Sequence, residues 1–260
     1  MLTAKRTATL PAVFARDSEK ADGPFMCPGC SAEVILHKGN IKIHHFKHKP
    51  PMTCARGEGE SLHHLIAKLA IYDALMKEHN VSGLALEKDF GVSVADVFAV
   101  ISGVPVALEI QRSSLSTAEI ARRTVNYRQL GIAVLWIALH KPELLGDKYN
   151  PNAWEKWCHA AYFGRAYYWV GGQSLLPVHF GEYMLHVKST EWYESGGEHK
   201  SAGGYDRSSK RYRKPNPGTV VLISQSFSAT DKAPYEQGTV NVPACRLYVD
   251  RLGAWWKKRA

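Results

Sequence analysis

Residues 92–111, VSVADVFAVISGVPVALEIQ, are two runs of apolar and β-branched residues with a short break between them. Such runs predict neighbouring strands over 92–100 and 104–111, joined by a tight connection at 101–103. Asp96 and Glu109 would then lie on adjacent strands. Two carboxylates buried side by side repel unless a cation or a proton separates them, so the pair indicates a divalent metal or a shifted pKa. The alternative is an ordinary hairpin with both acids on its solvated face.

Regular patterns continue on both sides of these two strands. Apolar residues spaced three and four apart predict an amphipathic helix over about 61–78, and a third strand is predicted at 83–87. A capping box at 116–119 begins a second helix that ends near Gly131, and 132–139 has the uniform apolarity of a buried strand. The order helix, three strands, helix, strand predicts an α/β fold with a mixed sheet, because a crossover helix makes the strands that it joins parallel.

The first predicted helix carries a second stripe, made of polar residues. Glu60, His64 and Lys68 are four residues apart and therefore lie on one face. The side chains of Glu60 and His64 would then face the element that packs beside the start of the helix. The alternative is a solvated polar face, which is what most soluble helices show.

A metal-binding pattern precedes this helix. Cys27-Pro-Gly-Cys30 is followed by His45-Phe-Lys-His48 at a spacing close to the two-cysteine, two-histidine zinc pattern, with a hairpin turning near residue 39 between the pairs. His44 is an alternative to His45 because the helical finger pattern prefers three residues between its histidines, and Cys54 is a further alternative ligand. Four protein ligands would make this a structural zinc site.

Composition narrows the class of protein. The chain has 260 residues, a formal net charge of +9 and a pI near 9.3, which favour an anionic partner such as nucleic acid. The five cysteines are odd in number and widely spread, which argues against a disulfide framework. Neither a run long enough to span a bilayer nor a secretory signal is visible, so we expect no membrane association and a cytoplasmic location.

The last third of the chain is less regular. A short helix is predicted to begin at Trp154, followed by strands over 165–170, 175–180 and 183–187, and 219–249 is expected to return to strands. Aromatic residues among basic ones could stack on single-stranded bases, but in strands they more often pack in a core. Residues 194–218 are rich in Gly, Ser, Lys and Arg and are predicted to form a mobile basic loop.

Taken in order, these motifs resemble the competence protein CoiA-like family over about residues 10–180. The resemblance is carried by the Cys and His element at 27–48, Glu60-Ser-x-x-His64, Ala95-Asp96-Val97, Glu109-Ile-Gln111, Arg123 with Tyr127, and GIAVLWI at 131–137. It implies a restriction-endonuclease-like core of the PD-(D/E)xK nuclease group, an N-terminal zinc-finger-like segment and a small sheet after the core.

The resemblance also implies a site that cleaves phosphodiester bonds. Asp96 and Glu109 would hold magnesium or manganese, hard ions that prefer oxygen ligands. Glu60 would complete the coordination directly or through a water, and His64 would orient it or assist proton transfer. Gln111 lies two residues after the glutamate, where most members of the wider group have a lysine, and its amide can position a water but carries no charge.

Two further side chains would support this site. Arg123 suits a phosphate contact or an ion pair with the site carboxylates, and Tyr127 would assist it one helical turn later. A surface salt bridge is the alternative for Arg123.

The sequence therefore predicts a zinc-stabilised DNA endonuclease that depends on magnesium or manganese and acts in competence, recombination or a mobile element. Its predicted regions are 1–58 with the zinc segment, 59–145 with the nuclease-like core, and 146–260, a helical and mostly β region. Predicted partners are DNA, single strands included, and recombination or DNA-processing proteins. The alternative is a noncatalytic DNA-binding or recombination-loading module on the same fold, and preference for RNA would indicate an RNA-processing nuclease.

Overall fold

The computed structural model of this chain describes residues 1–7, 10–40, 42–51, 54, 60–111 and 115–255. The helices are α1 (Leu62–Leu75), α2 (Thr117–Gln129), α3 (Ala153–Ala161) and α4 (Ile223–Ser226), with 3-10 turns at Ala15–Asp17, Lys20–Asp22 and Pro142–Leu145. None of the helices in these described residues is both long and apolar enough to cross a bilayer.

The strands fall into an N-terminal group, a central group and a C-terminal group. They are β1 (Thr3–Ala4), β2 (Val13–Phe14), β3 (Phe25–Met26), β4 (Glu33–His37) and β5 (His45–His48); β6 (Val81–Asp89), β7 (Val94–Ile101), β8 (Val104–Gln111), β9 (Ala133–Leu139) and β10 (Ala166–Gly171); and β11 (Ser174–Val187), β12 (Thr190–Tyr193), β13 (His199–Ala202), β14 (Tyr205–Pro217), β15 (Val221–Leu222), β16 (Phe227–Lys232), β17 (Tyr235–Gln237), β18 (Val240–Val242) and β19 (Cys245–Asp250).

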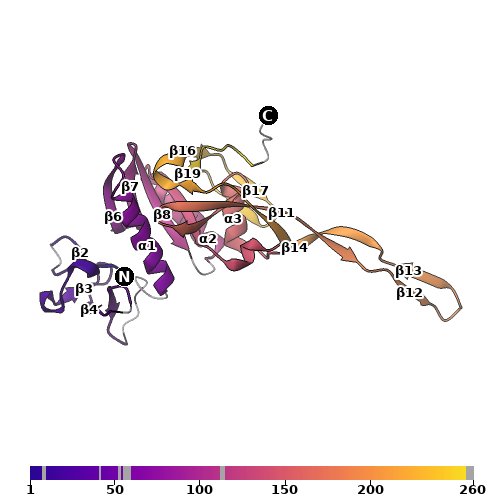
Figure 1. Cartoon of the computed structure of the whole chain (residues 1–260), viewed down its shortest axis with the longest axis horizontal. Coiled ribbons are helices and arrows are strands. Elements are labelled where there is room, and N and C mark those ends of the chain that lie inside the picture. The colour runs from indigo at the N-terminus through magenta and orange to yellow at the C-terminus, as the bar shows by residue number, and fades with distance from the viewer. Residues whose placement is uncertain (8–9, 41, 52–53, 55–59, 112–114, 256–260) are drawn as a thin grey trace.

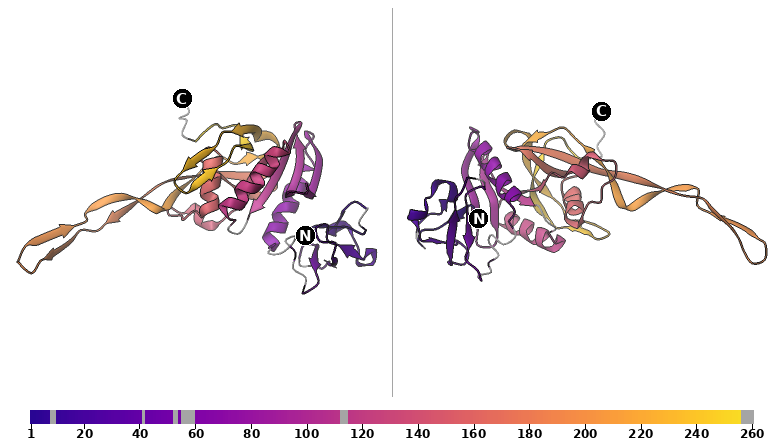
Figure 2. Two further views of the ribbon diagram at one scale, coloured as in Figure 1. Left: turned by 180° about the vertical axis from the view of Figure 1, so that it is seen from behind. Right: turned by 60° about the horizontal axis from the view of Figure 1, so that its bottom comes forward.

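Ten of these strands form one mixed sheet within the described part of the chain. Its path is β14-β11-β10-β9-β8-β7-β6, and β15, β16 and β19 pair with it off this path. The strands β6, β7 and β8 are antiparallel neighbours, whereas β8, β9 and β10 are parallel and are connected through α2 and α3. Helix α1 lies over one face of the sheet, and α2 and α3 lie over the other (Figures 1 and 2). The predicted mixed sheet and the predicted order from α1 to β9 are confirmed.

Local sequence explains where these elements begin and end. Ser61 and Ser116 cap α1 and α2, each accepting a hydrogen bond from the backbone of the residue three positions later. Gly131 follows α2 with a φ of 71°, the left-handed conformation of a helix C-terminus. Ser102 and Gly103 connect β7 to β8 with φ angles of 49° and 80°, as a two-residue hairpin turn requires.

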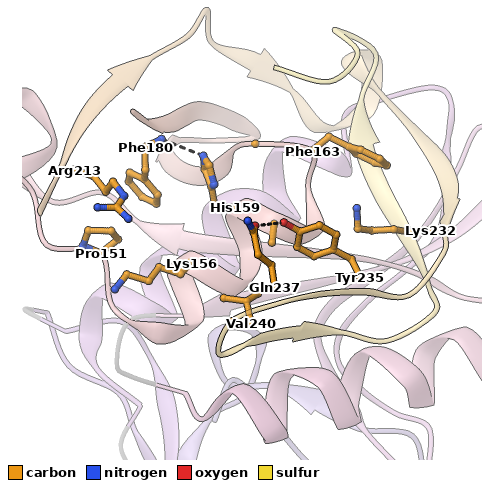
Figure 3. A pocket seen from close by; sticks show the side chains of 13 residues that line it. Pro151, Lys156, His159, Phe163, Phe180, Arg213, Lys232, Tyr235, Gln237 and Val240 are labelled. Carbon is orange, nitrogen blue, oxygen red and sulfur yellow. Dashed lines mark hydrogen bonds between the residues drawn. The ribbon is translucent and has the colours of Figure 1, made fainter. Parts of the chain in front are cut away.

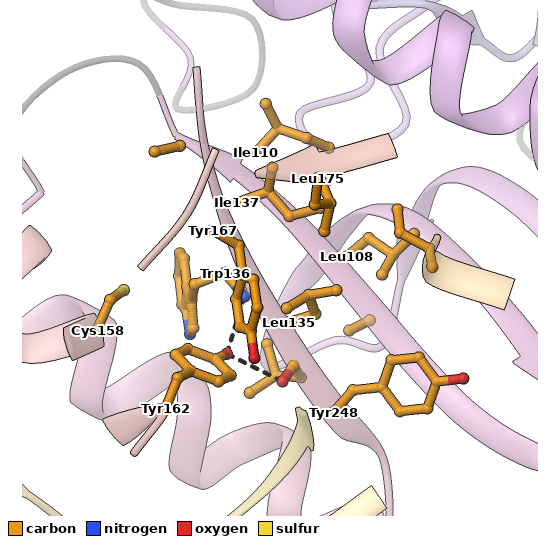
Figure 4. Packing of buried hydrophobic residues seen from close by; sticks show 14 of the residues in the cluster. Leu108, Ile110, Leu135, Trp136, Ile137, Cys158, Tyr162, Tyr167, Leu175 and Tyr248 are labelled. Carbon is orange, nitrogen blue, oxygen red and sulfur yellow. Dashed lines mark hydrogen bonds between the residues drawn. The ribbon is translucent and has the colours of Figure 1, made fainter. Parts of the chain in front are cut away.

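Strand β9 forms the centre of the core. Its residues from Ala133 to Ala138 are all buried, because helices and C-terminal strands cover both faces of the sheet (Figure 4). Tyr162, also fully buried, accepts a hydrogen bond from the Trp136 backbone at 2.9 Å and donates one to the Val134 carbonyl at 3.1 Å. These bonds satisfy polar groups of β9, and β9 in turn fixes β8, where Glu109 lies opposite Trp136.

The N-terminal group forms a small unit of its own. Strands β3, β4 and β5 make an antiparallel sheet with a separate core that includes Phe25, Val34 and Phe46. The first strand of the predicted hairpin is present as β4, but it pairs with β5, so His45 and His48 lie in the second strand of the hairpin and not after it. The predicted boundary at 58 falls among residues 55–59, which lie outside the described residues.

The C-terminal part differs from the prediction in two ways. The predicted boundary between residues 145 and 146 lies between strands of the same sheet, because β10 pairs with β9 and β11 continues from β10. The segments predicted as separate strands at 175–180 and 183–187 are one strand, β11. The ten-stranded sheet thus continues from the predicted core into the C-terminal part, which also contains the two-stranded sheets β12-β13 and β17-β18.

Residues 194–218 were predicted to be a loop, and that prediction was wrong. They contain β13 and β14, and β14 pairs with β11 from Pro217 opposite Val178 to Tyr205 opposite Val187. The two strands form a ribbon that extends away from the rest of the sheet, with β12 and β13 at its far end (Figure 1). Because most side chains of β14 are exposed, no alternation of apolar residues marks this strand in the sequence.

A buried ion pair attaches β19 to the sheet, and it gives a stability prediction. Arg165 and Asp250 are only 2% and 4% exposed, and their side chains pair while Tyr167 donates a hydrogen bond to Asp250 Oδ2 at 2.7 Å. We predict that Asp250→Ala lowers the free energy of unfolding by about 3–5 kcal/mol, because the Arg165 guanidinium stays buried without its counter-ion.

The matched control is Asp231→Ala, which removes an exposed pair with Arg246 at 3.2 Å and is expected to cost less than about 1 kcal/mol. Urea denaturation followed by tryptophan fluorescence measures both variants. Equal losses of stability would contradict the role assigned to the buried pair.

Candidate functional site

Helix α1 and the residue before its N-cap bring three polar side chains to one edge of the sheet. Its N-cap, Ser61, fixes the first turn by accepting a hydrogen bond from the His64 backbone at 3.2 Å. Glu60, His64 and Lys68 follow one another at intervals of four residues and face β6 and β7. The polar stripe predicted from the sequence therefore faces the protein and is not a solvated surface.

Lys68 is the centre of this arrangement. Its side chain is 2% exposed, and its Nζ pairs with Asp96 Oδ1 at 2.9 Å, with Glu87 Oε1 at 3.2 Å and with Glu60 Oε1. Burial alone would lower the pKa of Lys68, but the three carboxylates outweigh burial and raise the pKa well above its usual value. Lys68 is therefore a fixed positive charge at neutral pH.

Sequence reasoning did not include Lys68 or Glu87 among the site residues. Lys68 had a signal, because it continues the stripe of Glu60 and His64 by one more helical turn. Glu87 had none beyond its position in a predicted strand. In the structure Glu87 also accepts hydrogen bonds from the backbone nitrogens of Leu2 and Thr3 at 2.8 and 3.1 Å, so residues near the start of the chain pack against the site.

Asp96 lies on β7 where the pairing of β7 with β8 stops. The last paired residues are Val97 and Leu108, and beyond them the Ile110 backbone nitrogen donates to Asp96 Oδ2 at 2.9 Å. His64 Nε2 lies 3.1 Å from the same oxygen. Burial would raise the pKa of Asp96, but Lys68 and His64 outweigh it and lower the pKa well below its usual range. Asp96 is therefore ionised at neutral pH.

His64 links Asp96 to Glu60. Its Nδ1 lies 3.5 Å from Glu60 Oε1, so the imidazole lies between two carboxylates. Burial opposes protonation of His64, but Asp96 outweighs burial and the pKa of His64 is raised. Burial likewise opposes ionisation of Glu60, yet Lys68 and the ammonium of Met1, 2.8 Å from Glu60 Oε2, outweigh it and lower the pKa of Glu60 to about 2. Ligand atoms of Glu60, His64 and Asp96 all lie within 4.8 Å of one another, a group that we call the acidic cluster.

Glu109 is turned toward helix α2 and differs from the prediction in its partners. Its carboxylate is buried, and Oε1 accepts hydrogen bonds from Arg123 Nη2 and Tyr127 Oη, both at 2.5 Å. Burial raises the pKa of Glu109 to about 7, with Arg123 acting in the opposite direction. The predicted metal ligands were Asp96 and Glu109, whereas the donor atoms that the structure groups around Asp96 belong to Glu60 and His64.

The remaining predicted residues lie beside this cluster. Arg123 forms the ion pair with a site carboxylate that the sequence suggested, and its Nη2 also donates to the Val94 carbonyl at 2.9 Å. Tyr127 is fully buried against Glu109. Gln111 is the last residue of β8, opposite Ala138 of β9.

A second cluster lies in the N-terminal unit. Ligand atoms of Cys27, Cys30, His48 and Cys54 lie within 4.8 Å of one another, with 4.0 Å between the Cys27 and Cys54 sulfurs and 3.3 Å between Cys30 Sγ and His48 Nε2. Tetrahedral zinc with Zn–S bonds of about 2.3 Å places its sulfurs about 3.8 Å apart, so this zinc-type donor set fits the ion. An accepted hydrogen bond from the Ala32 backbone is the main reason that the pKa of Cys30 is lowered to about 7, which favours the thiolate that zinc requires.

His45 does not belong to this cluster, so Cys54 takes the place that was predicted for it. His45 and His48 are on strand β5, where residues three apart point to opposite sides. His45 instead stacks on His37, and its Nδ1 lies 2.8 Å from the Ile43 carbonyl. The predicted pair of histidines therefore cannot face the cysteines together from this strand.

Comparison with known proteins gives two matches, both to family models. "Competence protein CoiA, N-terminal domain" matches residues 15–56, which contain the zinc-type cluster. "Competence protein CoiA, nuclease-like domain" matches residues 60–157, which contain the acidic cluster, Lys68 and Glu109. No curated protein and no solved structure gives a match.

The ligand set of the zinc-type cluster can be tested by metal analysis. We predict that the purified protein carries about one zinc ion per chain and that Cys54→Ser loses it, because four protein ligands close a structural site. His45→Gln serves as the matched control and is expected to keep its zinc. Loss of zinc in His45→Gln with full retention in Cys54→Ser would contradict the assignment.

Proposed function

We propose that this chain, which belongs to the competence protein CoiA family, is a metal-dependent nuclease that hydrolyses phosphodiester bonds of DNA. The observation that carries the proposal is the position of the Lys68 ammonium, 2.9 Å from Asp96 within the nuclease-like domain. A fixed cation beside ionised carboxylates is what a site needs when negative charge develops on a phosphate. Gln111 provides no such cation, and Lys68 supplies it from helix α1 instead.

The acidic cluster has donors that suit a divalent ion. Its two carboxylates favour magnesium or manganese, which are hard ions that prefer oxygen ligands. A bound ion would neutralise charge on the phosphate and lower the pKa of its water. The proposed ligands are Asp96 and Glu60, because both are ionised at neutral pH, whereas burial raises the pKa of Glu109 to about 7.

Lys68 acts through its charge and not as a base. Its pKa is raised well above the usual value by Asp96, Glu87 and Glu60, so it does not release its proton at neutral pH. We assign it two tasks, holding the carboxylates of the acidic cluster at their separations and stabilising negative charge on the phosphate.

His64 and Gln111 are assigned to orientation. The raised pKa of His64 favours the imidazolium, which donates to Asp96 and Glu60 and thereby fixes their oxygens. Gln111 follows Glu109 at the end of β8, and its amide would position the attacking water. Arg123 remains paired with Glu109, which fixes both against helix α2.

One observation favours a second candidate, a noncatalytic DNA-binding or recombination-loading module. Lys68 already compensates Glu60, Glu87 and Asp96, and Arg123 compensates Glu109, so these carboxylates have cationic partners without any metal. Carboxylates whose charges are balanced by protein side chains can form a stable network with a purely structural role. The net charge of +9 supports DNA binding equally in both cases.

Cleavage assays separate the two candidates. We predict that the protein cuts labelled DNA with magnesium or manganese, and that Asp96→Asn and Lys68→Met each reduce the rate on the order of 10²–10³-fold by removing a ligand or a stabilising charge. Single- and double-stranded DNA and RNA of equal length are compared, so a preference for RNA would also be seen.

The matched control is Lys77→Met, which removes an exposed lysine just after α1 and should leave the rate unchanged. Zinc content and circular dichroism verify that each variant is folded, and Lys68→Gln, which also removes the charge, replaces Lys68→Met if the latter unfolds. DNA binding without cleavage by either ion would favour the noncatalytic module. Cleavage that is unchanged in Asp96→Asn would exclude the acidic cluster as its source.

A further inference from the structure

A pocket of about 620 Å³ lies outside the acidic cluster, in the C-terminal part of the fold (Figure 3). We call it the basic pocket and define it by Lys156 and His159 of α3, Phe180 of β11, Arg213 of β14, Lys232 of β16 and Tyr235 of β17. Neither family model reaches most of these residues, because the second match ends at residue 157. Its volume is that of a small-molecule or single-nucleotide site and is too small for a duplex.

The pocket combines positive charge with an absence of acids among its described lining residues. Lys156, Arg213 and Lys232 contribute three cations, and no Asp or Glu is among the residues that line it. Three acids are adjacent to lining residues in sequence without lining the pocket themselves: Glu155, which pairs with Lys141 at 2.8 Å, Asp231, which pairs with Arg246 at 3.2 Å, and Glu236. Cations gathered in a concave site raise the local concentration of anions, so the pocket selects for a negatively charged ligand.

The backbone and the neighbouring carbonyls fix Arg213 in position. Its backbone exchanges two hydrogen bonds with Tyr149, at 2.9 and 2.8 Å, where β14 passes the segment before α3. Its Nη1 donates to the carbonyls of Ser209 at 2.6 Å and Tyr212 at 2.8 Å. A guanidinium held in this way loses little freedom when it binds a phosphate.

Lys232 is a partly desolvated cation. Its Nζ lies 4.2 Å from the centre of the Phe163 ring and 5.6 Å from that of Tyr235. Burial lowers the pKa of Lys232, because the partly buried ammonium loses hydration. A bound anion would offset this loss of hydration.

His159 contributes a hydrogen bond and not a charge. Burial lowers the pKa of His159 to about 4, and its Nε2 accepts from the Phe180 backbone at 3.1 Å, so the neutral ring carries its proton on Nδ1. The ring stacks on Phe180 with 5.3 Å between centres. In Figure 3 Arg213 and Lys156 lie to one side of His159, and Lys232 and Tyr235 lie to the other.

We propose that the basic pocket binds a nucleotide unit of single-stranded DNA, with one phosphate near Arg213 and Lys156, the next near Lys232, and the base against Tyr235. Each nucleoside of a strand has a phosphate on both sides, which matches cations on both sides of His159. Tyr235 is 39% exposed and presents a ring on which a base can stack without regard to sequence. The choice of DNA as the nucleic acid rests on the proposed function.

The test measures binding of a fluorescent oligothymidylate by anisotropy, with zinc retained and no magnesium or manganese added, so that no strand is cut. Lys232→Gln and Tyr235→Ala are expected to weaken binding about tenfold each, the usual effect of removing a stacking or phosphate partner. The matched controls are Lys210→Gln and Tyr205→Ala, exposed residues of β14 outside the pocket, which should change affinity less than about twofold because general charge attraction is shared among many lysines and arginines.

Competition identifies the ligand. A trinucleotide of thymidylate should displace the labelled strand at lower concentration than thymidine 5′-monophosphate, because only the trinucleotide presents phosphates on both sides of a base. Equal competition by the two would assign the pocket to free nucleotides and overturn the strand proposal. Equal losses in Lys232→Gln and Lys210→Gln, or tighter and equally Lys232-dependent binding of an RNA of the same length, would also overturn it. Because this assay needs no cleavage, its result is independent of whether the acidic cluster is catalytic.

Discussion

The buried ammonium of Lys68 is the group on which the geometry of the nuclease-like domain depends. It joins Glu60 at the start of α1, Glu87 on β6 and Asp96 on β7. Burying one cation without partners costs several kcal/mol, and burying three carboxylates together without a cation costs more. Neither the lysine nor the carboxylates could occupy these positions alone, so the helix and the two strands are held in one relative arrangement.

The same network limits how the acidic cluster can work. A metal ion bound by Asp96 and Glu60 would have ligands that also pair with Lys68. The acidic cluster would then hold an exchangeable metal ion beside the permanent charge of the Lys68 ammonium. Glu109, by contrast, is matched to Arg123 and Tyr127 on the other side of β8 and supports the packing of α2. The two acids of the hairpin thus have different partners although they follow each other along adjacent strands.

Much of this arrangement could be predicted from sequence, because the core elements have strong periodic signals. The hairpin containing Asp96, the capped helix after Ser116 and the buried strand β9 each have local patterns that the fold keeps. Glu60, His64 and Asp96 were predicted as site residues and lie together in the acidic cluster. The pairing of Glu109 with Arg123 and Tyr127, outside this cluster, could not be predicted, because it depends on which side chains α1 and α2 bring to each strand.

Other predictions from the sequence were incomplete or wrong, each for an identifiable physical reason. Lys68 lay on a stripe that fits a solvated helix face equally well, and only the tertiary packing of α1 on the sheet buries it. His45 was predicted as a ligand from its distance in sequence to the cysteines, but on strand β5 its side chain points to the opposite side from His48. Strand β14 pairs with β11, but most of the side chains of β14 are exposed, so the composition of this segment suggested a loop.

Binding of manganese to the zinc-loaded protein, measured by electron paramagnetic resonance, tests most directly whether the acidic cluster is a metal site organised around Lys68. We expect a bound ion in the wild type, its loss in Asp96→Asn, and its retention in Glu109→Gln, since Glu109 is held by Arg123 and Tyr127. Equal manganese binding in the wild type and in Asp96→Asn, or loss in Glu109→Gln alone, would contradict this account.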